Sequence, residues 1–444
     1  MLTYPKTSPT VPAPNQLFTR FFDPLDDALA RADGQRRCPV IDDRQWLLAG
    51  VLRALEPVAS GRDFLQRMFP ALSSVRPESS EANRSTYFEA LKSERRLRHL
   101  EQAATHLAAS MGKGAADPLA GLPGLENFSV FAGDGHWHAH AVHDSAWPAS
   151  ANRDEPPESR KYAVGHLYGL NLRSGALIHL GACDAQTRRK EHDMRALKRL
   201  EIDTLRQGAP KGGKVLWIWD KAGIDFRQWY AWKQRAGVYF LSRAKENMKL
   251  QQEAAELPWD RGDSINAGVQ RDCLCGTSTG VQVRWVQYRD PIGGAVYDFV
   301  TNLMGVPPGT IAQLYRMRWD IEKVFDDIKN KQGEKKAWAS GETAKRMQAQ
   351  LICLAHNLMR LCERWLATDQ GIVNEAEVRR RDKRVATLAS RLEKQGQSLP
   401  EPWMLARRFT QVSVKLIRWL RVYLLAPTSL PPALGALRRA YATL

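Results

Sequence analysis

LYRMRWDIEKVFDDIKNK, residues 314–331, is the stretch from which the rest of the chain is interpreted. Its polar residues Tyr315, Arg318, Glu322 and Lys329 fall at offsets of 0, +3, +7 and +14. At about 100° per residue, these positions share an arc of roughly 60° on one helix. The apolar residues of the stretch project away from that arc: Leu314, Met317, Ile321, Val324, Phe325 and Ile328. The pattern predicts a helix that buries one face and presents a carboxylate, two cations and a phenol on the other.

Two acids elsewhere in the chain directly follow apolar runs. Residues 128–133 read FSVFAG and precede Asp134, and residues 214–219 read KVLWIW and precede Asp220. Short apolar runs of this kind are typical of buried strands. Each acid is therefore expected at the carboxyl end of a strand.

The segments between these runs predict how the two acids are arranged. Residues 162–170 and 176–182 have the composition of two more strands, and residues 190–206 have helical spacing. The order strand, strand, strand, helix, strand would put Asp134 and Asp220 on neighbouring strand tips of a mixed sheet.

A third acid is expected if this edge of the sheet carries out metal-dependent chemistry. Two divalent ions aligned on a phosphodiester need several carboxylate oxygens, and Glu322 is the candidate for the third acid. On spacing alone, residues 314–331 fit an ordinary surface helix with charge pairs just as well. The two strand-end acids favour the functional interpretation over this alternative.

The charge of the chain favours a polyanionic partner. The 444 residues include 65 Lys and Arg against 48 Asp and Glu, for a formal charge of +17. Basic runs recur along the whole chain: 95–98, 188–190, 379–384 and 407–408. Each run alone is more often a solvated face, but their spread suggests a long nucleic-acid track.

The composition also predicts the compartment. No stretch approaches the roughly 20 apolar residues of a membrane span, and the N-terminus lacks a charged start followed by an apolar run. Only Cys273 and Cys275 lie close together among six cysteines, with no second pair to complete a zinc site. We expect a soluble, cytoplasmic protein with no membrane partner.

Three regions are expected along the chain. Residues 1–120 predict a helical region that binds DNA ends, with a mobile arm over the first 16 residues. Within it, Arg95, Arg96 and Arg98 would suit a helix docked on DNA backbone, and an all-helical packing domain is the alternative. Residues 121–335 predict the catalytic region, and its broken, Gly-containing segment at about 247–294 a β-rich insertion. Residues 336–444 predict a helical C-terminal region.

The signature Tyr-x2-Arg-x3-Glu-x6-Lys, from Tyr315 to Lys329, resembles that of bacterial cut-and-paste DDE transposases of the insertion-sequence-four group, which includes the Tn-five type. Asp134 and Asp220 fit the other two catalytic acids of that group. The resemblance covers about residues 125–335. It implies an α/β catalytic core of ribonuclease-H-like type with a β-rich insertion, flanked by helical N- and C-terminal domains.

The resemblance also implies roles for the site residues. Two Mg²⁺ ions, or Mn²⁺ ions in their place, would be held by Asp134, Asp220 and Glu322. The ions would activate the attacking oxygen and stabilise the leaving oxygen. The other signature residues would grip DNA phosphates: Tyr315, Arg318 and Lys329. The implied enzyme is a DNA transposase that cleaves the ends of its element and joins the 3′-OH ends to target DNA, through a hairpin intermediate.

Two features depart from the group. An aromatic residue stacks on a flipped base in the Tn-five type, where Trp lies near the position of Tyr297 in this chain. Trp285 is a second candidate, and core packing is the alternative for both. Separately, three histidines alternate with Asp134 and fit either an extra metal site or a solvated or hydrogen-bonded face: His136, His138 and His140.

The expected partner is double-stranded DNA, both the terminal inverted repeats of the element and the target. Synapsis of two ends implies a homodimer on DNA, and the bacterial context implies association with the nucleoid. Two other functions are open to the same sequence. One is a catalytically idle, domesticated DNA-binding regulator, and the other is a non-transposing nuclease on the same fold.

Overall fold

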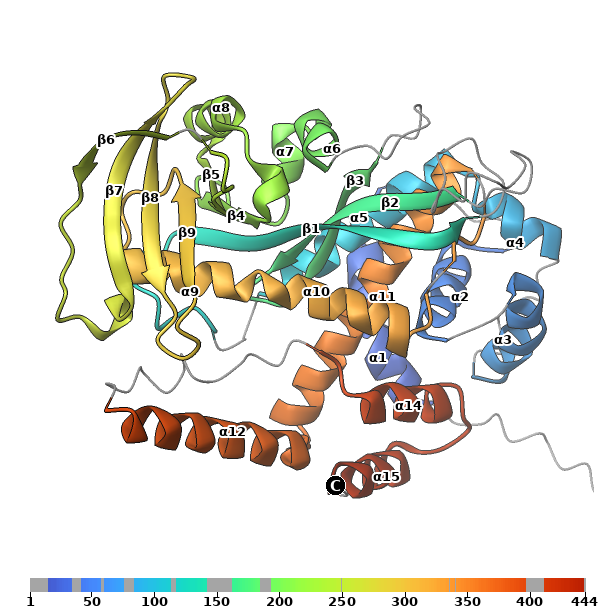
Figure 1. Ribbon diagram of the computed structural model, residues 1–444. Coiled ribbons are helices and arrows are strands. Elements are labelled where there is room, and N and C mark those ends of the chain that lie inside the picture. The colour runs from blue at the N-terminus through green and yellow to red at the C-terminus, as the bar shows by residue number, and fades with distance from the viewer. Residues whose placement is uncertain are drawn as a thin grey trace, which may run out of the picture.

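The computed structural model describes residues 15–33, 41–56, 60–75, 84–112, 117–141, 162–183, 193–248, 250–334, 336–339, 341–396 and 411–442. Its centre is a nine-stranded sheet with the order β3-β2-β1-β4-β5-β9-β8-β7-β6 (Figure 1). The strands are β1 (Phe128–Ala141), β2 (Tyr162–Asn171), β3 (Leu177–Ala182), β4 (Lys214–Trp219), β5 (Val238–Arg243), β6 (Leu250–Glu256), β7 (Val269–Thr277), β8 (Gln282–Arg289) and β9 (Val296–Thr301). The chain is thus a mixed α/β protein with a large central sheet and helical flanks.

The middle of the sheet is parallel and its two sides are antiparallel. β1, β4 and β5 lie side by side in parallel, whereas β2 and β3 follow antiparallel on the outer side of β1. On the other side, β9 pairs antiparallel with β5, and β8, β7 and β6 continue in the same manner. The strands between Leu250 and Arg289 therefore extend the central sheet through β9.

The two faces of the sheet belong to different clusters of the core. Leu216 and Ile218 of β4 pack with the helices that carry the signature, whereas Trp217 and Trp219 pack with α8 (Phe226–Ala236) on the other face. A central strand covered on both faces needs apolar side chains at every position, which explains the unbroken run VLWIW.

The signature stretch forms three helical segments where one continuous helix was predicted. α9 (Pro308–Met317) and α10 (Trp319–Asp326) cross the sheet as one rod, followed by a π-helical turn (Asp327–Lys331) (Figure 1). At the junction, the Arg318 N–H donates to the Tyr315 carbonyl three residues back, at 3.1 Å, which tightens the turn. The predicted apolar arc is buried, except that Met317 is half-buried.

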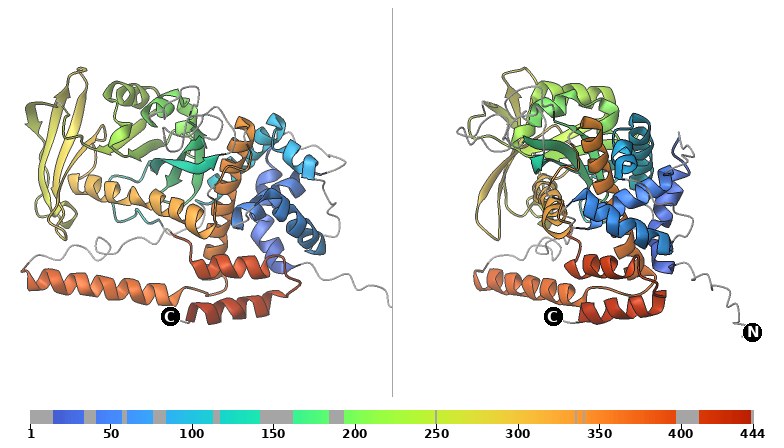
Figure 2. Two further views of the ribbon diagram at one scale, coloured as in Figure 1. Left: turned by 45° about the vertical axis from the view of Figure 1, so that its right-hand side comes forward. Right: turned by 90° about the vertical axis from the view of Figure 1, so that its right-hand side faces the viewer.

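Further helices flank the sheet, most of them from the N- and C-terminal regions of the chain and two from between β3 and β4. They are α1 (Gln16–Leu29), α2 (Asp43–Leu55), α3 (Gly61–Val75), α4 (Arg84–Ala90), α5 (Glu94–Ser110), α6 (Asp193–Arg199), α7 (Ile202–Leu205), α11 (Glu342–Thr368), α12 (Glu375–Lys394), α14 (Val414–Tyr423) and α15 (Leu430–Ala442). α11 packs against α1, α2, α5 and β3 and so joins the N-terminal helices to the sheet. Figures 1 and 2 show α12, α14 and α15 as a layer beside the α9–α10 rod. No helix in the described ranges is long and apolar enough to cross a membrane.

Residues 1–14 of the predicted N-terminal arm lie outside the described residues, whereas Asn15 and Gln16 form the start of α1. The Asn15 side chain caps α1 by accepting from the Phe18 N–H at 3.1 Å. Its amide also donates to the carbonyls of Tyr423, Leu424 and Ala426, at 3.1, 3.1 and 2.6 Å. Asn15 therefore ties the start of α1 to the C-terminal helices.

The basic flank of α5 has a structural partner. Arg95 and Arg96 both bind the buried carboxylate of Asp43 on α2, with N–O distances between 2.6 and 2.9 Å. Two of the three arginines that suggested a DNA-docking helix thus hold α5 to α2, because a buried carboxylate needs paired cations.

Candidate active site

Asp134 and Asp220 lie at the same level on neighbouring parallel strands. The last paired residues of β1 and β4 are Ala132 and Ile218, and each acid lies two positions further along. Asp220 directly follows β4, as predicted, and its carboxylate accepts from the Ala222 N–H at 2.8 Å. Asp134 does not end its strand, because β1 continues to Ala141 in antiparallel pairing with β2.

A glycine leaves room for a tryptophan ring at this level. Gly133 precedes Asp134, and a Cβ at Gly133 would lie 2.6 Å from the ring of Trp219, the residue before Asp220. A larger residue at Gly133 would therefore displace the Trp219 ring beside the two acids.

Glu322 of α10 reaches the site through Arg318. The Arg318 Nη2 atom donates to Glu322 Oε1 at 2.5 Å, and Nη1 donates to Asp134 Oδ2 at 3.5 Å. The side chain of Arg318 is 7% exposed, against 22% for Asp134 and 33% for Glu322. The guanidinium thus lies between a carboxylate from the sheet and one from the helix that crosses it.

The electrostatics of the site also link the three acids. Burial raises the pKa of Asp134 to about 6, and the charges of Asp220 and Glu322 add to that rise, whereas Arg318 and the Gly135 N–H oppose it. Burial alone would lower the pKa of Arg318, but its hydrogen bond to Glu322 and its negative neighbours hold that pKa above the ordinary value. The charges of both other acids therefore act on the pKa of Asp134.

Carboxylate oxygens are the ligands that Mg²⁺ and Mn²⁺ prefer, so the three acids fit such an ion by donor type. Within the described ranges, no three acidic, histidine or cysteine side chains are grouped closely enough to hold a metal ion. The guanidinium of Arg318 instead supplies positive charge between Asp134 and Glu322. The three acids therefore fit a divalent metal ion by the type of their donor atoms. In this structure Asp134 and Glu322 are arranged around the guanidinium of Arg318.

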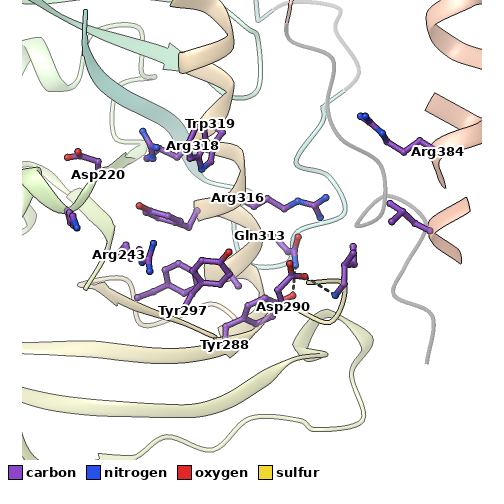
Figure 3. Close-up of a pocket in the computed structure, with 16 residues that line it drawn as sticks. Asp220, Arg243, Tyr288, Asp290, Tyr297, Gln313, Arg316, Arg318, Trp319 and Arg384 are labelled. Carbon is purple, nitrogen blue, oxygen red and sulfur yellow. Dashed lines mark hydrogen bonds between the residues drawn. The ribbon is translucent and has the colours of Figure 1, made fainter. Parts of the chain in front are cut away.

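A cavity of about 600 Å³ adjoins Asp220 and Arg318 (Figure 3). Tyr315 and Trp319 line it from the α9–α10 rod, and Tyr288 and Tyr297 line it from β8 and β9. The other lining residues are Lys221, Arg243, Asp290, Ile292, Phe299, Ala312, Gln313, Arg316, Arg384 and Leu388. The aromatic rings and cations that line this cavity suit a partner with both bases and phosphates.

The two aromatic candidates differ in position. Tyr297 lines the cavity, with Phe299 stacked beside it and the Arg243 guanidinium 5.2 Å from its ring centroid. Trp285 packs with Cys273 and its neighbours in a separate core cluster. Trp319, which is 56% exposed, lies at the cavity and was missed from sequence, although its place between Arg318 and Glu322 was a usable signal.

Lys329 lies in the π-helical turn that follows α10 and is exposed there. A π-helix turns less per residue than the 100° assumed for the arc, so the angular position of Lys329 departs from the extrapolated one. Its charge contributes to lowering the pKa of His136 and of His138. In the parts of the chain that are described, the Lys329 amine forms no hydrogen bond or ion pair with Glu322.

His136 and His138 do not face solvent, and they form no metal site with other side chains of the described residues. His136 stacks on Phe325 of α10, with ring centroids 4.7 Å apart, and His138 is also buried. Burial lowers the pKa of His136 to about 2 and that of His138 to about 4. Both rings are therefore neutral at physiological pH, with His136 packed against α10 and His138 packed against His136 and His166 of β2. The side chain of His140 lies outside the described residues.

Acids on neighbouring strands, a third acid on a crossing helix and a basic aromatic cavity beside them define an enzyme class that acts on phosphodiesters of nucleic acids. The family model described as "Transposase DDE domain" matches residues 135–358, just over half of the chain. The chain therefore belongs to the DDE transposase family, whose members act on DNA. The matched range begins one residue after Asp134 and includes Asp220 and Glu322. A comparison with curated proteins found no match.

Proposed function

We propose that this transposase cleaves the ends of its own insertion element and joins the freed 3′-OH ends to target DNA. The observation that carries this proposal is the position of Asp134 and Asp220 at one level of two parallel strands, with Glu322 joined to Asp134 through Arg318. The complete Tyr-Arg-Glu-Lys signature supports a member of the insertion-sequence-four group, and the strand order is compatible with a ribonuclease-H-like core.

Asp134, Asp220 and Glu322 would hold two Mg²⁺ ions, or Mn²⁺ in their place. Such ions lower the pKa of an attacking water or 3′-hydroxyl and stabilise the leaving oxygen. The residues of the chain orient the DNA: the Arg318 guanidinium offers a fork to phosphate oxygens, and the Tyr315 hydroxyl can donate to the same backbone. Lys329, at the exposed end of the rod, would contact phosphates further from the acids.

We further propose a hairpin intermediate, because the cavity beside Asp220 offers room for an unstacked base. Tyr297 is the stacking candidate, since it lines this cavity and Trp285 packs in a different cluster. Tyr315 and Trp319 line the wall that the rod contributes.

The flanking regions would bring the DNA and a second copy of the chain into place. We propose that residues 1–120 bind the terminal inverted repeats and that residues 336–444 contribute dimerisation and DNA contact. The basic run of α12 supports the DNA contact, because residues 379–384 are all exposed and Arg384 lines the cavity. The site of action would be the bacterial cytoplasm, on the nucleoid.

Glu322→Gln is the first test. Purified wild-type chain is incubated with Mg²⁺ and a duplex carrying the repeats that flank its gene, and end cleavage is read on a gel. The variant should lose cleavage but keep its DNA affinity and circular dichroism spectrum, because an uncharged amide of nearly the same shape replaces the carboxylate. Asp326→Asn, one turn further along the rod, is the matched control and should cleave as the wild type does.

The other candidate functions predict different products. An idle DNA-binding regulator would bind the duplex without cleaving it in the wild type. A non-transposing nuclease would cleave without joining 3′ ends to a target plasmid. Retained cleavage in Glu322→Gln would reject the proposed acid triad.

A further inference from the structure

Arg318 lies between Asp134 and Glu322, and one of its hydrogen-bond donors has no partner among the described residues. Its two terminal nitrogens reach Asp134 and Glu322, but its Nε atom is buried without a hydrogen-bond partner among the described residues. A buried donor without a hydrogen-bond partner is energetically unfavourable. The observed arrangement is therefore one from which Arg318 can gain by moving.

The same carboxylate oxygens cannot serve Arg318 and a divalent cation equally. A guanidinium hydrogen-bonded to Glu322 Oε1 and Asp134 Oδ2 draws on the oxygens that a metal ion would need. A divalent cation would also repel the guanidinium, since two positive charges a few ångströms apart in a half-buried site interact strongly. Binding of Arg318 to these carboxylates and binding of a metal ion to them therefore compete.

A second binding position for the Arg318 side chain lies beside the acids. Arg318 also lines the cavity beside Asp220, and its guanidinium carbon lies 5.9 Å from the Tyr315 ring centroid and 5.2 Å from that of Trp319. Arginine stacks readily on aromatic faces and binds phosphate through two parallel hydrogen bonds. The side chain thus adjoins both the acids and the surface where a DNA phosphate would lie.

We propose that Arg318 is an exchangeable counter-ion. It neutralises Asp134 and Glu322 while the acids carry no metal ion, a divalent cation displaces it, and the displaced guanidinium then binds a DNA phosphate at the cavity. The inference rests on the proposed metal site at the three acids. It adds that Arg318 weakens metal binding without DNA and couples metal binding to DNA binding.

The first test is Mn²⁺ binding by the full chain without DNA, measured by electron paramagnetic resonance or calorimetry. Arg318→Gln should bind Mn²⁺ at least about tenfold more tightly than the wild type, because the competing guanidinium is gone. Arg318→Ala is a second variant in case either one folds poorly. Arg316→Gln is the matched control, since it removes the same charge two residues away on the same rod, where Figure 3 shows the side chain pointing away from Asp220.

Asp134→Asn separates failure of the exchange from failure of the metal site. If Asp134→Asn weakens Mn²⁺ binding but both Arg318 variants bind as the wild type does, the exchange is wrong and the metal site stands. If Mn²⁺ binding is undetectable in every chain, or unchanged in Asp134→Asn, both proposals are wrong. Equal tightening in Arg316→Gln would reject the exchange, because a general charge effect would explain it.

The second test concerns the coupling to DNA. With Ca²⁺ in place of Mn²⁺, the wild type should bind the duplex of its flanking repeat more tightly than it does in EDTA. By thermodynamic reciprocity, the same factor describes the gain in Ca²⁺ affinity that DNA produces. Arg318→Gln should lose most of this gain, whereas Arg235→Gln, which removes an exposed cation of α8 outside the cavity, should keep it. A gain that is unchanged in Arg318→Gln would overturn the second half of the exchange.

Discussion

At the scale of single residues, Asp134 carries an unfavourable charge in the folded chain. Its pKa of about 6 lies above the ordinary value of 3.8, so the folded state binds the proton more tightly than the unfolded state does. The stabilising contribution of the protonated group is complete below about pH 4 and is lost as the pH rises through 6. Neutral pH therefore destabilises the fold at this position.

Asp134→Asn should raise the melting temperature of the metal-free chain at pH 7.5, because the buried negative charge is removed. A pKa rise of about two units corresponds to an upper limit of about 3 kcal/mol, reduced in practice by loss of the contact with Arg318. The gain should shrink to nothing as the pH falls to about 4. Thermal unfolding in EDTA from pH 4 to 8 measures this, with Asp326→Asn as control. A gain that does not change with pH would contradict the assignment.

At the scale of elements, a buried ion pair joins the outer strands to the signature rod. Arg284 of β8 makes two hydrogen bonds to Asp272 of β7, at 2.8 and 2.6 Å. It also donates to the carbonyl of Val306, just before α9, at 2.8 Å. Arg284 thus links the strands that carry Tyr288 to the start of the rod that carries Tyr315, and so the two walls of the cavity.

Asp272→Ala should destabilise the chain strongly, because it leaves Arg284 buried without its counter-charge. Removal of one partner from a buried ion pair typically costs about 3–5 kcal/mol. The melting temperature should fall clearly, as measured by differential scanning fluorimetry. Glu256→Ala is the matched control, since its pair with Arg271 is exposed and spans 4.0 Å, and it should change little. Similar behaviour of both variants would show that Arg284 does not hold the cavity walls together.

The elements also show what the sequence could predict. The strands that precede Asp134 and Asp220 were predictable, because a strand buried on both faces has no polar positions. The continuation of β1 past Asp134 was not, since it depends on pairing with β2. The junction between α9 and α10 at Arg318 was not predictable either, because an argument from helical spacing assumes an unbroken helix. The cavity joins residues that follow β4 with residues of β5, β8, β9, the rod and α12, and no local sequence pattern predicts that these segments meet.

At the scale of the whole molecule, the formal charge of +17 implies strongly salt-dependent DNA binding. Each phosphate contact releases counterions, so affinity for a duplex should fall at least about a hundredfold between about 50 and 200 mM salt. The basic run of α12 should account for part of this dependence. Neutralising three of its exposed cations to glutamine should lower the slope of log affinity against log salt by about 2–3: Arg380, Arg381 and Lys383.

The control carries three neutralised cations near α8, on the opposite face of the sheet from the rod. These residues are exposed as well: Lys211, Arg227 and Arg235. The control should leave the slope nearly unchanged if DNA lies along α12. Equal losses in the two triple variants would indicate general attraction by net charge and no track along α12.

The contact between Asn15 and the carbonyls near residue 424 has a consequence for synthesis on the ribosome. At about 5–20 residues per second, the first helix leaves the ribosome roughly 20–80 s before the segment whose carbonyls it binds. During that interval the Asn15 amide lacks these three carbonyl partners, and α1 is not yet joined to the C-terminal helices. Translation that stops before Ala426 would leave this junction open, so the N-terminal helices reach their final packing only when the far end of the chain has been made.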